Sequence, residues 1–161
     1  MTLYHFTDSR NIPSIKRYGL LSWRILVNRN IPHWPASSKM SRVLDAKRNL
    51  QGYIRLCTRC EHPMAYRAIM EGRVKELVWL EIDDTVMRWQ STLFSSENAV
   101  SKTAIINNDP QTALESSSIQ AEVLICGGLK NRWIMLPNRK SARSADNSTL
   151  PPIEAYGDFP S

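Results

Sequence analysis

The spacing of apolar residues divides the chain into short strands and helices. Alternation over residues 3–6 predicts a strand. Apolar residues three apart over 12–18 then predict a helix that ends at Gly19. Residues 23–35 mix tryptophan, asparagine, proline and arginine without a period, so we expect a long loop there, of the kind that is functional or mobile.

The remainder of the chain contains more strands than helices. We expect helices at 40–50 and 61–72 and strands at 53–57, 77–82, 89–94, 121–126 and 133–136. Residues 107–118 are polar and rich in turn formers. This order predicts an α+β fold with a mainly antiparallel sheet. The sequence has no glycine-rich phosphate loop and no dinucleotide-binding strand–turn–helix motif, so it does not predict a nucleotide site of the Rossmann kind.

Composition sets the domain organisation. The 161 residues suit one domain, and we expect it to occupy residues 1–137. Residues 138–161 are rich in serine, asparagine, proline and charge, so we expect a polar tail that is disordered or loosely packed. The start of the chain does not resemble a secretory signal, and the apolar runs are too short to span a bilayer, so we expect a cytoplasmic protein.

The formal net charge of +6 favours a polyanionic partner, although on charge alone a generic basic surface is the simpler explanation. Cys57 and Cys60 have a metal-like spacing, which His62 and Cys126 could complete. A structural zinc site usually needs two such pairs, so we expect no metal.

Glu122 is a lone carboxylate in an otherwise apolar strand. Gln120 lies two residues earlier, so both side chains would face the same groove. A solvent-facing glutamate on an edge strand explains the pattern equally well. Near the start of the chain, His5, Thr7 and Asn11 form a compact polar set that could hydrogen-bond an amide and a ribose, although a lone histidine in a strand is more often structural.

Two further residues have both a functional and a structural explanation. Arg42 could clamp a phosphate through two hydrogen bonds, or it could lie on a solvated helix face with Lys47 and Arg48. Tyr66 could stack on a planar ligand, or it could be an ordinary core aromatic.

Several short segments, taken in order, resemble the DarT family of DNA ADP-ribosyltransferase toxins. The resemblance extends from Leu3 to about Pro137. The matching segments are Tyr4-His5-Phe6-Thr7, Asn11-Ile12-Pro13-Ser14-Ile15 with Gly19-Leu20-Leu21, Ser41-Arg42-Val43-Leu44-Asp45, Tyr53-Ile54-Arg55-Leu56 with His62-Pro63-Met64-Ala65-Tyr66, Thr92-Leu93-Phe94-Ser95 with Asn98-Ala99, and Gln120-Ala121-Glu122-Val123-Leu124.

The resemblance implies the ADP-ribosyltransferase fold, in which NAD lies in a cleft between two split, mainly antiparallel sheets. The catalytic residues would be Glu122 and Arg42, with Arg48 as a competing candidate for the arginine. The residues that bind NAD would be His5, Thr7, Asn11, Tyr66 and Gln120. Basic and aromatic residues of the long loop could hold single-stranded DNA; these are Arg24, Arg29, Trp34 and Lys39.

The implied reaction transfers ADP-ribose from NAD to a thymine or guanine of single-stranded DNA. A carboxylate held beside the ribose would stabilise the positive charge that builds there, and the same glutamate would help remove the proton from the base nitrogen. A base must be unstacked to react, so a single strand is the economical substrate. Such proteins act as toxins or phage-defence effectors, usually paired with a macrodomain antitoxin.

One departure from the family leaves other functions open. The segment between Asn98 and Gln120 is short for the family, in which it helps to position the target base. The acceptor could therefore be RNA or a protein side chain. A third possibility is a non-catalytic nucleic-acid-binding module on the same scaffold.

Overall fold

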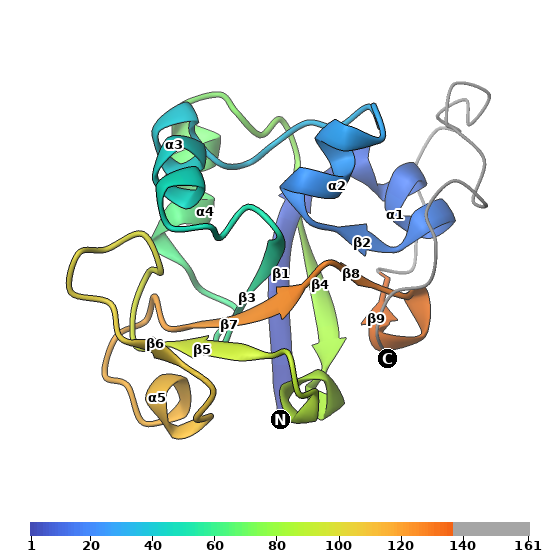
Figure 1. The fold of residues 1–161 in the computed structure, drawn as a ribbon. Helices are drawn as coiled ribbons and strands as arrows, with labels where there is room; N and C mark the ends of the chain where they lie inside the picture. The colour runs from blue at the N-terminus through green and yellow to red at the C-terminus, as the bar shows by residue number, and fades with distance from the viewer. Residues whose placement is uncertain (137–161) are drawn as a thin grey trace.

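The computed structural model describes residues 1–136, and its main sheet has seven strands in the order β6-β5-β7-β3-β1-β4-β9 (Figure 1). Every strand pair is antiparallel. The strands are β1 (Thr2–Asp8), β3 (Tyr53–Cys57), β4 (Leu77–Asp83), β5 (Leu93–Ser95), β6 (Ile106–Asn107), β7 (Glu122–Cys126) and β9 (Ile134–Met135). A second sheet pairs β2 (Leu20–Leu21) with β8 (Gly128–Leu129).

The helices are short. They are α1 (Ile12–Tyr18), α2 (Trp23–Asn28), α3 (Lys39–Lys47), α4 (Pro63–Met70) and α5 (Gln111–Leu114), with 3-10 turns at Ser9–Asn11, Asp84–Arg88 and Asn131–Trp133. None of the helices in residues 1–136 is long and apolar enough to cross a membrane. The α+β class with a mainly antiparallel sheet is therefore confirmed. The expected tail, residues 138–161, lies outside the described residues.

The main sheet is split between β1 and β3. Strand β1 pairs with β4 along its whole length, from Thr2 opposite Asp83 to Asp8 opposite Leu77. It pairs with β3 only at Tyr4, opposite Cys57. Beyond that point the two strands diverge, and a cleft opens between the two halves of the sheet.

Two packing features hold the elements around this split. The hydrophobic core joins both halves, with fully buried Leu3 in β1, Leu56 in β3 and Val123 in β7. Helix α1 ends at Gly19, which has a φ of +82° and lies so close to β8 that an added Cβ would stand 2.1 Å from the carbonyl oxygen of Leu129. Only glycine suits this position, because it tolerates the positive φ and leaves room for the neighbouring strand.

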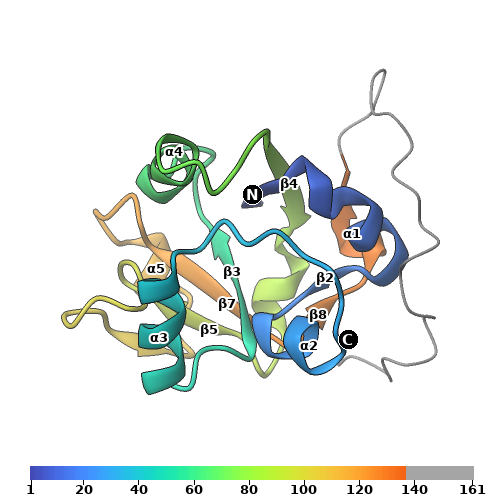
Figure 2. The ribbon, with the colours of Figure 1, turned by 90° about the horizontal axis from the view of Figure 1, so that it is seen from above.

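The loop expected at 23–35 is partly helical, and this expectation was wrong. Its first part forms α2 because Ile25 and Leu26 pack on a small cluster that contains Ile31. The segment that remains irregular, residues 29–38, joins α2 to α3 across the central strands (Figure 2). The helix forms because this apolar packing outweighs the weak periodicity of the segment.

Two expected strands begin later than predicted. The strand expected at 89–94 covers only Leu93–Ser95, because Trp89 ends a 3-10 turn and packs on Trp133 with ring centroids 5.8 Å apart. The strand expected at 121–126 begins at Glu122, and Gln120 lies in the preceding turn. The idea that Gln120 and Glu122 share one strand face is therefore wrong.

Candidate active site

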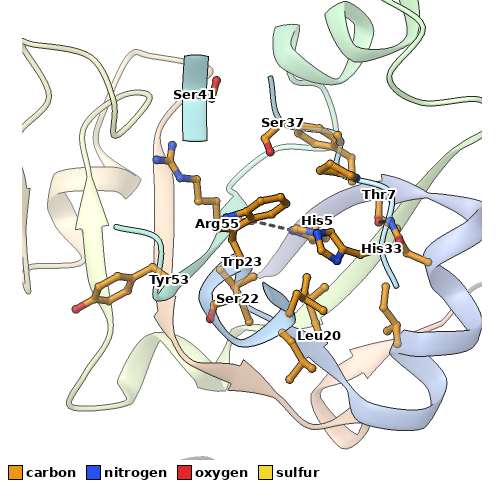
Figure 3. Close-up of a pocket in the computed structure, with 18 of the residues that line it drawn as sticks. His5, Thr7, Leu20, Ser22, Trp23, His33, Ser37, Ser41, Tyr53 and Arg55 are labelled. Carbon is orange, nitrogen blue, oxygen red and sulfur yellow. Dashed lines mark hydrogen bonds between the residues drawn. The ribbon is translucent and has the colours of Figure 1, made fainter. Parts of the chain in front are cut away.

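A cleft lies at the split in the main sheet, and its walls come from segments far apart in the sequence (Figure 3). One wall contains His5 and Thr7 of β1, and another contains Arg55 of β3. Residues 33–37 line it from the segment between α2 and α3. Glu122 enters the cleft from the first position of β7.

Glu122 is a buried carboxylate at this cleft, only 4% exposed. Its Oε2 accepts a hydrogen bond from the backbone N–H of Ala99 (2.8 Å) and another from the guanidinium of Arg55 (3.1 Å). Both bonds are accepted by Oε2. Oε1 accepts no hydrogen bond from the described residues, so it is the oxygen available to a ligand. Burial raises the pKa of Glu122, and the charge of Arg55 and the Ala99 N–H partly oppose this rise.

Arg55 fixes the position of this carboxylate. Its guanidinium bonds to Asp45 of α3, to Glu122, and to the side-chain oxygen of Asn98 (3.2 Å). Burial also raises the pKa of Asp45, against the charge and hydrogen bond of Arg55. One cation therefore balances two carboxylates from different elements, and it ties α3 to β3 and β7.

His5 presents a defined ring nitrogen to the cleft. Its Nδ1 lies 2.9 Å from the carbonyl oxygen of Arg55, which can only accept, so Nδ1 carries the proton (Figure 3). Burial lowers the pKa of His5 and keeps the ring neutral. Its Nε2 is consequently an acceptor, suited to a ribose hydroxyl or an amide N–H.

Asn11 anchors the segment that crosses the cleft. Its amide nitrogen donates to Thr7 Oγ1 (3.0 Å) and to the carbonyl oxygen of Trp34 (2.8 Å), and its amide oxygen accepts from the N–H of Trp34 (2.9 Å). Since these bonds use both amide hydrogens, Asn11 positions Thr7 and Trp34. Arg10 stacks on Trp34 with its guanidinium carbon 5.3 Å from the ring centroid.

The structure brings several of the predicted residues to the cleft. His5, Thr7, Asn11, Trp34 and Glu122 all line it. Their individual roles remain predictions, because position alone does not establish contact with a ligand.

Other predicted residues lie away from the cleft. Tyr66 is 56% exposed on the outer face of α4, whereas Met64, two residues earlier, lines the cleft. The two side chains diverge because successive helical positions turn by about 100°. Arg24, Arg29 and Lys39 are exposed, so they are accessible to a nucleic acid but do not form the cleft wall.

The two predicted arginines contact residues that line or adjoin the cleft. Arg42 donates to the carbonyl oxygen of Ser37, and its guanidinium carbon lies 4.7 Å from the ring centroid of Trp23. Both Ser37 and Trp23 line the cleft. Arg48 donates to the carbonyl oxygen of Ala99 (2.9 Å) and so steadies the loop whose N–H binds Glu122.

Several polar residues that line the cleft were not predicted as site residues, and Arg55, Ser22 and His62 are the most informative of them. Arg55 is a lone charge between Ile54 and Leu56, which is the same signal that singled out Glu122, so it could have been found. Ser22 and His62 are each 2% exposed, and each has a side-chain atom without a hydrogen-bond partner among the described residues, Oγ and Nε2 respectively. Their burial depends on tertiary packing, which the sequence does not reveal.

The split sheet, with a buried glutamate and a neutral histidine facing one cleft, defines the architecture of an ADP-ribosyltransferase. Residues 4–146 match the family model described as "ssDNA thymidine ADP-ribosyltransferase, DarT". The chain therefore belongs to the DarT family, as the sequence resemblance predicted.

Solved structures agree on the fold. DarTG of Thermosipho africanus in complex with ADP-ribose is 23% identical, with a TM-score of 0.71 over 83% of this chain and 42% of the other. DarT of Thermus sp. 2.9 in complex with ADP-ribosylated ssDNA is 18% identical, with a TM-score of 0.61 over 83% of this chain and 78% of that one. The NAD+ complex of the same Thermus protein is 17% identical, with a TM-score of 0.58 over 83% of this chain and 78% of that one. The chain thus spans less than half of the Thermosipho chain, and no match was found among curated proteins.

Proposed function

We propose that this protein transfers ADP-ribose from NAD to a thymine of single-stranded DNA and releases nicotinamide. The observation that carries the proposal is the buried Glu122 at the cleft of a DarT-family fold, with one carboxylate oxygen left for a ligand. The bond between nicotinamide and the ribose C1′ breaks, a bond from C1′ to the base nitrogen forms, and the base loses its proton.

Glu122 has two tasks in this reaction. Its negative charge stabilises the cation that develops on the ribose, and this effect is strong where water is excluded. Its raised pKa brings the carboxylate closer to the range in which it can accept the proton of the incoming base. The Ala99 N–H and Arg55 hold the carboxylate in place, so little reorganisation of the site is needed during the reaction.

The walls of the cleft suit a dinucleotide. His5 Nε2 offers an acceptor and the Ser22 hydroxyl offers a buried donor. The indole of Trp23 packs edge-on against His33, with centroids 4.8 Å apart, and both rings line the cleft. Aromatic and polar groups placed in this way are typical of sites that bind planar, polar ligands.

The segment over the cleft suits a DNA strand. Trp34 is 39% exposed at the mouth, with Arg10 stacked on it, so it offers a surface on which an unpaired base can stack. The net charge of +6 supports binding of the phosphate backbone, and Arg24, Arg29 and Lys39 are exposed residues that contribute to that charge. A macrodomain that removes ADP-ribose is the antitoxin that the family resemblance implies, and a cytoplasmic location fits this pairing.

The acceptor can be identified with a set of oligonucleotides. Single-stranded DNA oligonucleotides that each contain one thymine or one guanine within an otherwise unreactive sequence are incubated with NAD and analysed by mass spectrometry. We expect one ADP-ribosyl group on the thymine oligonucleotide and much less on its duplex. Modification of RNA or of lysate proteins, with all DNA unchanged, would refute DNA as the acceptor. Absence of NAD binding in calorimetry would favour a non-catalytic module.

A further inference from the structure

His62 lies in the wall of the cleft with its side chain almost fully buried. It precedes α4, and its Nδ1 accepts a hydrogen bond from the backbone N–H of Met64 (3.2 Å), which caps the helix. An acceptor nitrogen carries no proton, so the neutral ring carries its proton on Nε2. Burial lowers the pKa of His62, and the positive charge of Arg55 lowers it further, so the ring is neutral.

Within the described part of the chain, the Nε2–H group is a buried donor that has no hydrogen-bond partner. His62 is only 2% exposed, and its Nε2 has no hydrogen-bond partner among residues 1–136. The ring of Phe6 lies beside it, with centroids 5.8 Å apart and the planes tilted by 34°. That arrangement does not direct the N–H at the face of the phenyl ring. Unpartnered buried donors are rare in folded proteins because they lose their hydration without gaining a bond.

The surroundings indicate what could satisfy this donor. Phe6, His62 and Met64 all line the same cleft as Glu122. Solvent does not reach Nε2 in this structure, so a ligand must shift the neighbouring side chains slightly, and Met64 is the flexible one. A single neutral N–H suits one neutral acceptor, and a carbonyl oxygen is a strong acceptor of this kind. Arg55, by comparison, presents a full charge in the same cleft.

We propose that His62 donates a hydrogen bond through Nε2 to a carbonyl oxygen of a substrate bound in this cleft. The inference rests on the proposed function, whose two substrates each carry such a group: the carboxamide of nicotinamide and the thymine ring. His62 therefore has two bonds, one that caps α4 and one that orients the reacting substrate.

Two substitutions separate these bonds. Asparagine places its side-chain oxygen near the position of Nδ1, so His62→Asn keeps the helix cap and loses the distant donor. Glutamine places its amide nitrogen near the position of Nε2, so His62→Gln keeps a donor toward the cleft and loses the cap. A purely structural histidine would tolerate His62→Asn and suffer from His62→Gln, whereas a substrate-orienting histidine gives the reverse order of activities.

Binding and kinetics are measured for wild type and both variants. We expect His62→Asn to raise the Kd for NAD about tenfold while the Kd for ADP-ribose, which lacks the carboxamide, stays within about twofold. His62→Gln should bind NAD within about threefold of wild type, with a lower Tm. An unchanged Kd for NAD with a tenfold higher KM for the thymine oligonucleotide would assign the bond to the base and still support the proposal.

Other outcomes overturn it. If His62→Asn leaves both the Kd for NAD and the KM for DNA unchanged, His62 is only a cap. If it weakens NAD and ADP-ribose equally, the acceptor is not a carbonyl of nicotinamide or thymine. If wild type itself fails to bind NAD, the proposed function fails, and the assignment of His62 fails with it.

A measurement on the wild-type protein covers the case in which a variant does not fold. The imidazole nitrogens of His62 are followed by long-range nitrogen–proton NMR correlation during titration with NAD, with ADP-ribose, and with the thymine oligonucleotide. The proposal expects the Nε2 resonance to shift with NAD or the oligonucleotide and to stay in place with ADP-ribose. A resonance that does not respond to any of the three ligands refutes it.

Discussion

Replacement of Arg55 with glutamine removes the cation that balances Glu122 and Asp45. Arg55 is 21% exposed at its side chain, Glu122 is 6% and Asp45 is 18%, so water screens the three charges only partly. At an effective dielectric constant of about 20, two unit charges about 4 Å apart attract by about 4 kcal/mol. Loss of one partner from a buried pair typically costs about 3–5 kcal/mol, because the remaining charge stays buried. We expect Arg55→Gln to lower the free energy of unfolding by about 3 kcal/mol at neutral pH.

The loss of stability depends on pH. Burial raises the pKa of Glu122 above its ordinary value of 4.5, and likewise raises that of Asp45 above 3.8, so the folded state holds these protons more tightly than the unfolded state does. Stability therefore falls as pH rises from these ordinary values through the folded pKa values. Without Arg55 both folded pKa values rise further. The deficit of the variant is consequently smallest near pH 4 and grows toward neutral pH.

The same change affects catalysis. A more strongly protonated Glu122 cannot stabilise the ribosyl cation, so we expect kcat for ADP-ribose transfer to fall by about 10²–10³-fold at pH 7. In the pH–rate profile of any residual activity, the rise on the acidic side should occur at a higher pH than in wild type. Urea unfolding at several pH values and a pH–rate profile measure the two effects.

Three other arginines serve as comparisons for Arg55→Gln. Arg67 of α4 is 68% exposed and pairs with Glu71, the residue that follows the helix, so it is the matched surface control. Arg67→Gln should change neither the free energy of unfolding nor kcat measurably. Arg42 and Arg48 contact Ser37, Trp23 and Ala99 rather than Glu122, so we expect Arg42→Gln and Arg48→Gln to lower kcat/KM by no more than about tenfold. An Arg55→Gln variant with wild-type stability and an unshifted pH profile would refute this reasoning, as would a larger loss of activity from Arg42→Gln than from Arg55→Gln.

Three further substitutions test the cleft and the fold. Asn11→Ala frees Trp34 from its anchor, so KM for NAD should rise about tenfold with a smaller change in kcat, and an unchanged KM would show that the segment needs no anchor. Asp8 is fully buried; burial alone would raise its pKa, but hydrogen bonds from Arg10 and from the Lys75 N–H, with the charge of Arg10, together lower it. Asp8→Asn should therefore cost about 3 kcal/mol at pH 7, and the difference should shrink as pH falls below 3.8. Tyr66 is exposed, so Tyr66→Ala should leave kcat and KM unchanged. A large rise in KM for NAD would show that Tyr66 contacts NAD after all.

The fold was predictable wherever the local pattern and the tertiary packing agree. Strands β3 and β4 and helices α1 and α4 lie close to the residues expected for them, because apolar periodicity and terminal glycine or proline mark their bounds. Helix α2 was missed because its apolar side chains pack on Ile31, which follows it in the chain. The two-residue strands β2, β6 and β8 are defined only by pairing with another strand, so no local sequence pattern predicts them.

The site was predictable from charged residues placed in apolar strands. Glu122 follows this rule and lies at the cleft, and Arg55 follows it equally well. The resemblance directed attention to Arg42, although Arg55 is the arginine that pairs with Glu122. The role proposed for His62 was not predictable, because it depends on a buried Nε2 that lacks a hydrogen-bond partner among residues 1–136, and only three-dimensional packing reveals this.

We propose that Glu122 is the residue on which transfer of ADP-ribose from NAD to a thymine in single-stranded DNA depends. The most direct measurement is the intact mass of a thymine-containing oligonucleotide after a single turnover with wild type and with Glu122→Gln, alongside the Kd of each protein for NAD. We expect one added ADP-ribosyl group with wild type and none with the variant, although both bind NAD with similar affinity. Equal modification by the two proteins, or loss of NAD with an unmodified oligonucleotide in the wild-type reaction, would contradict it.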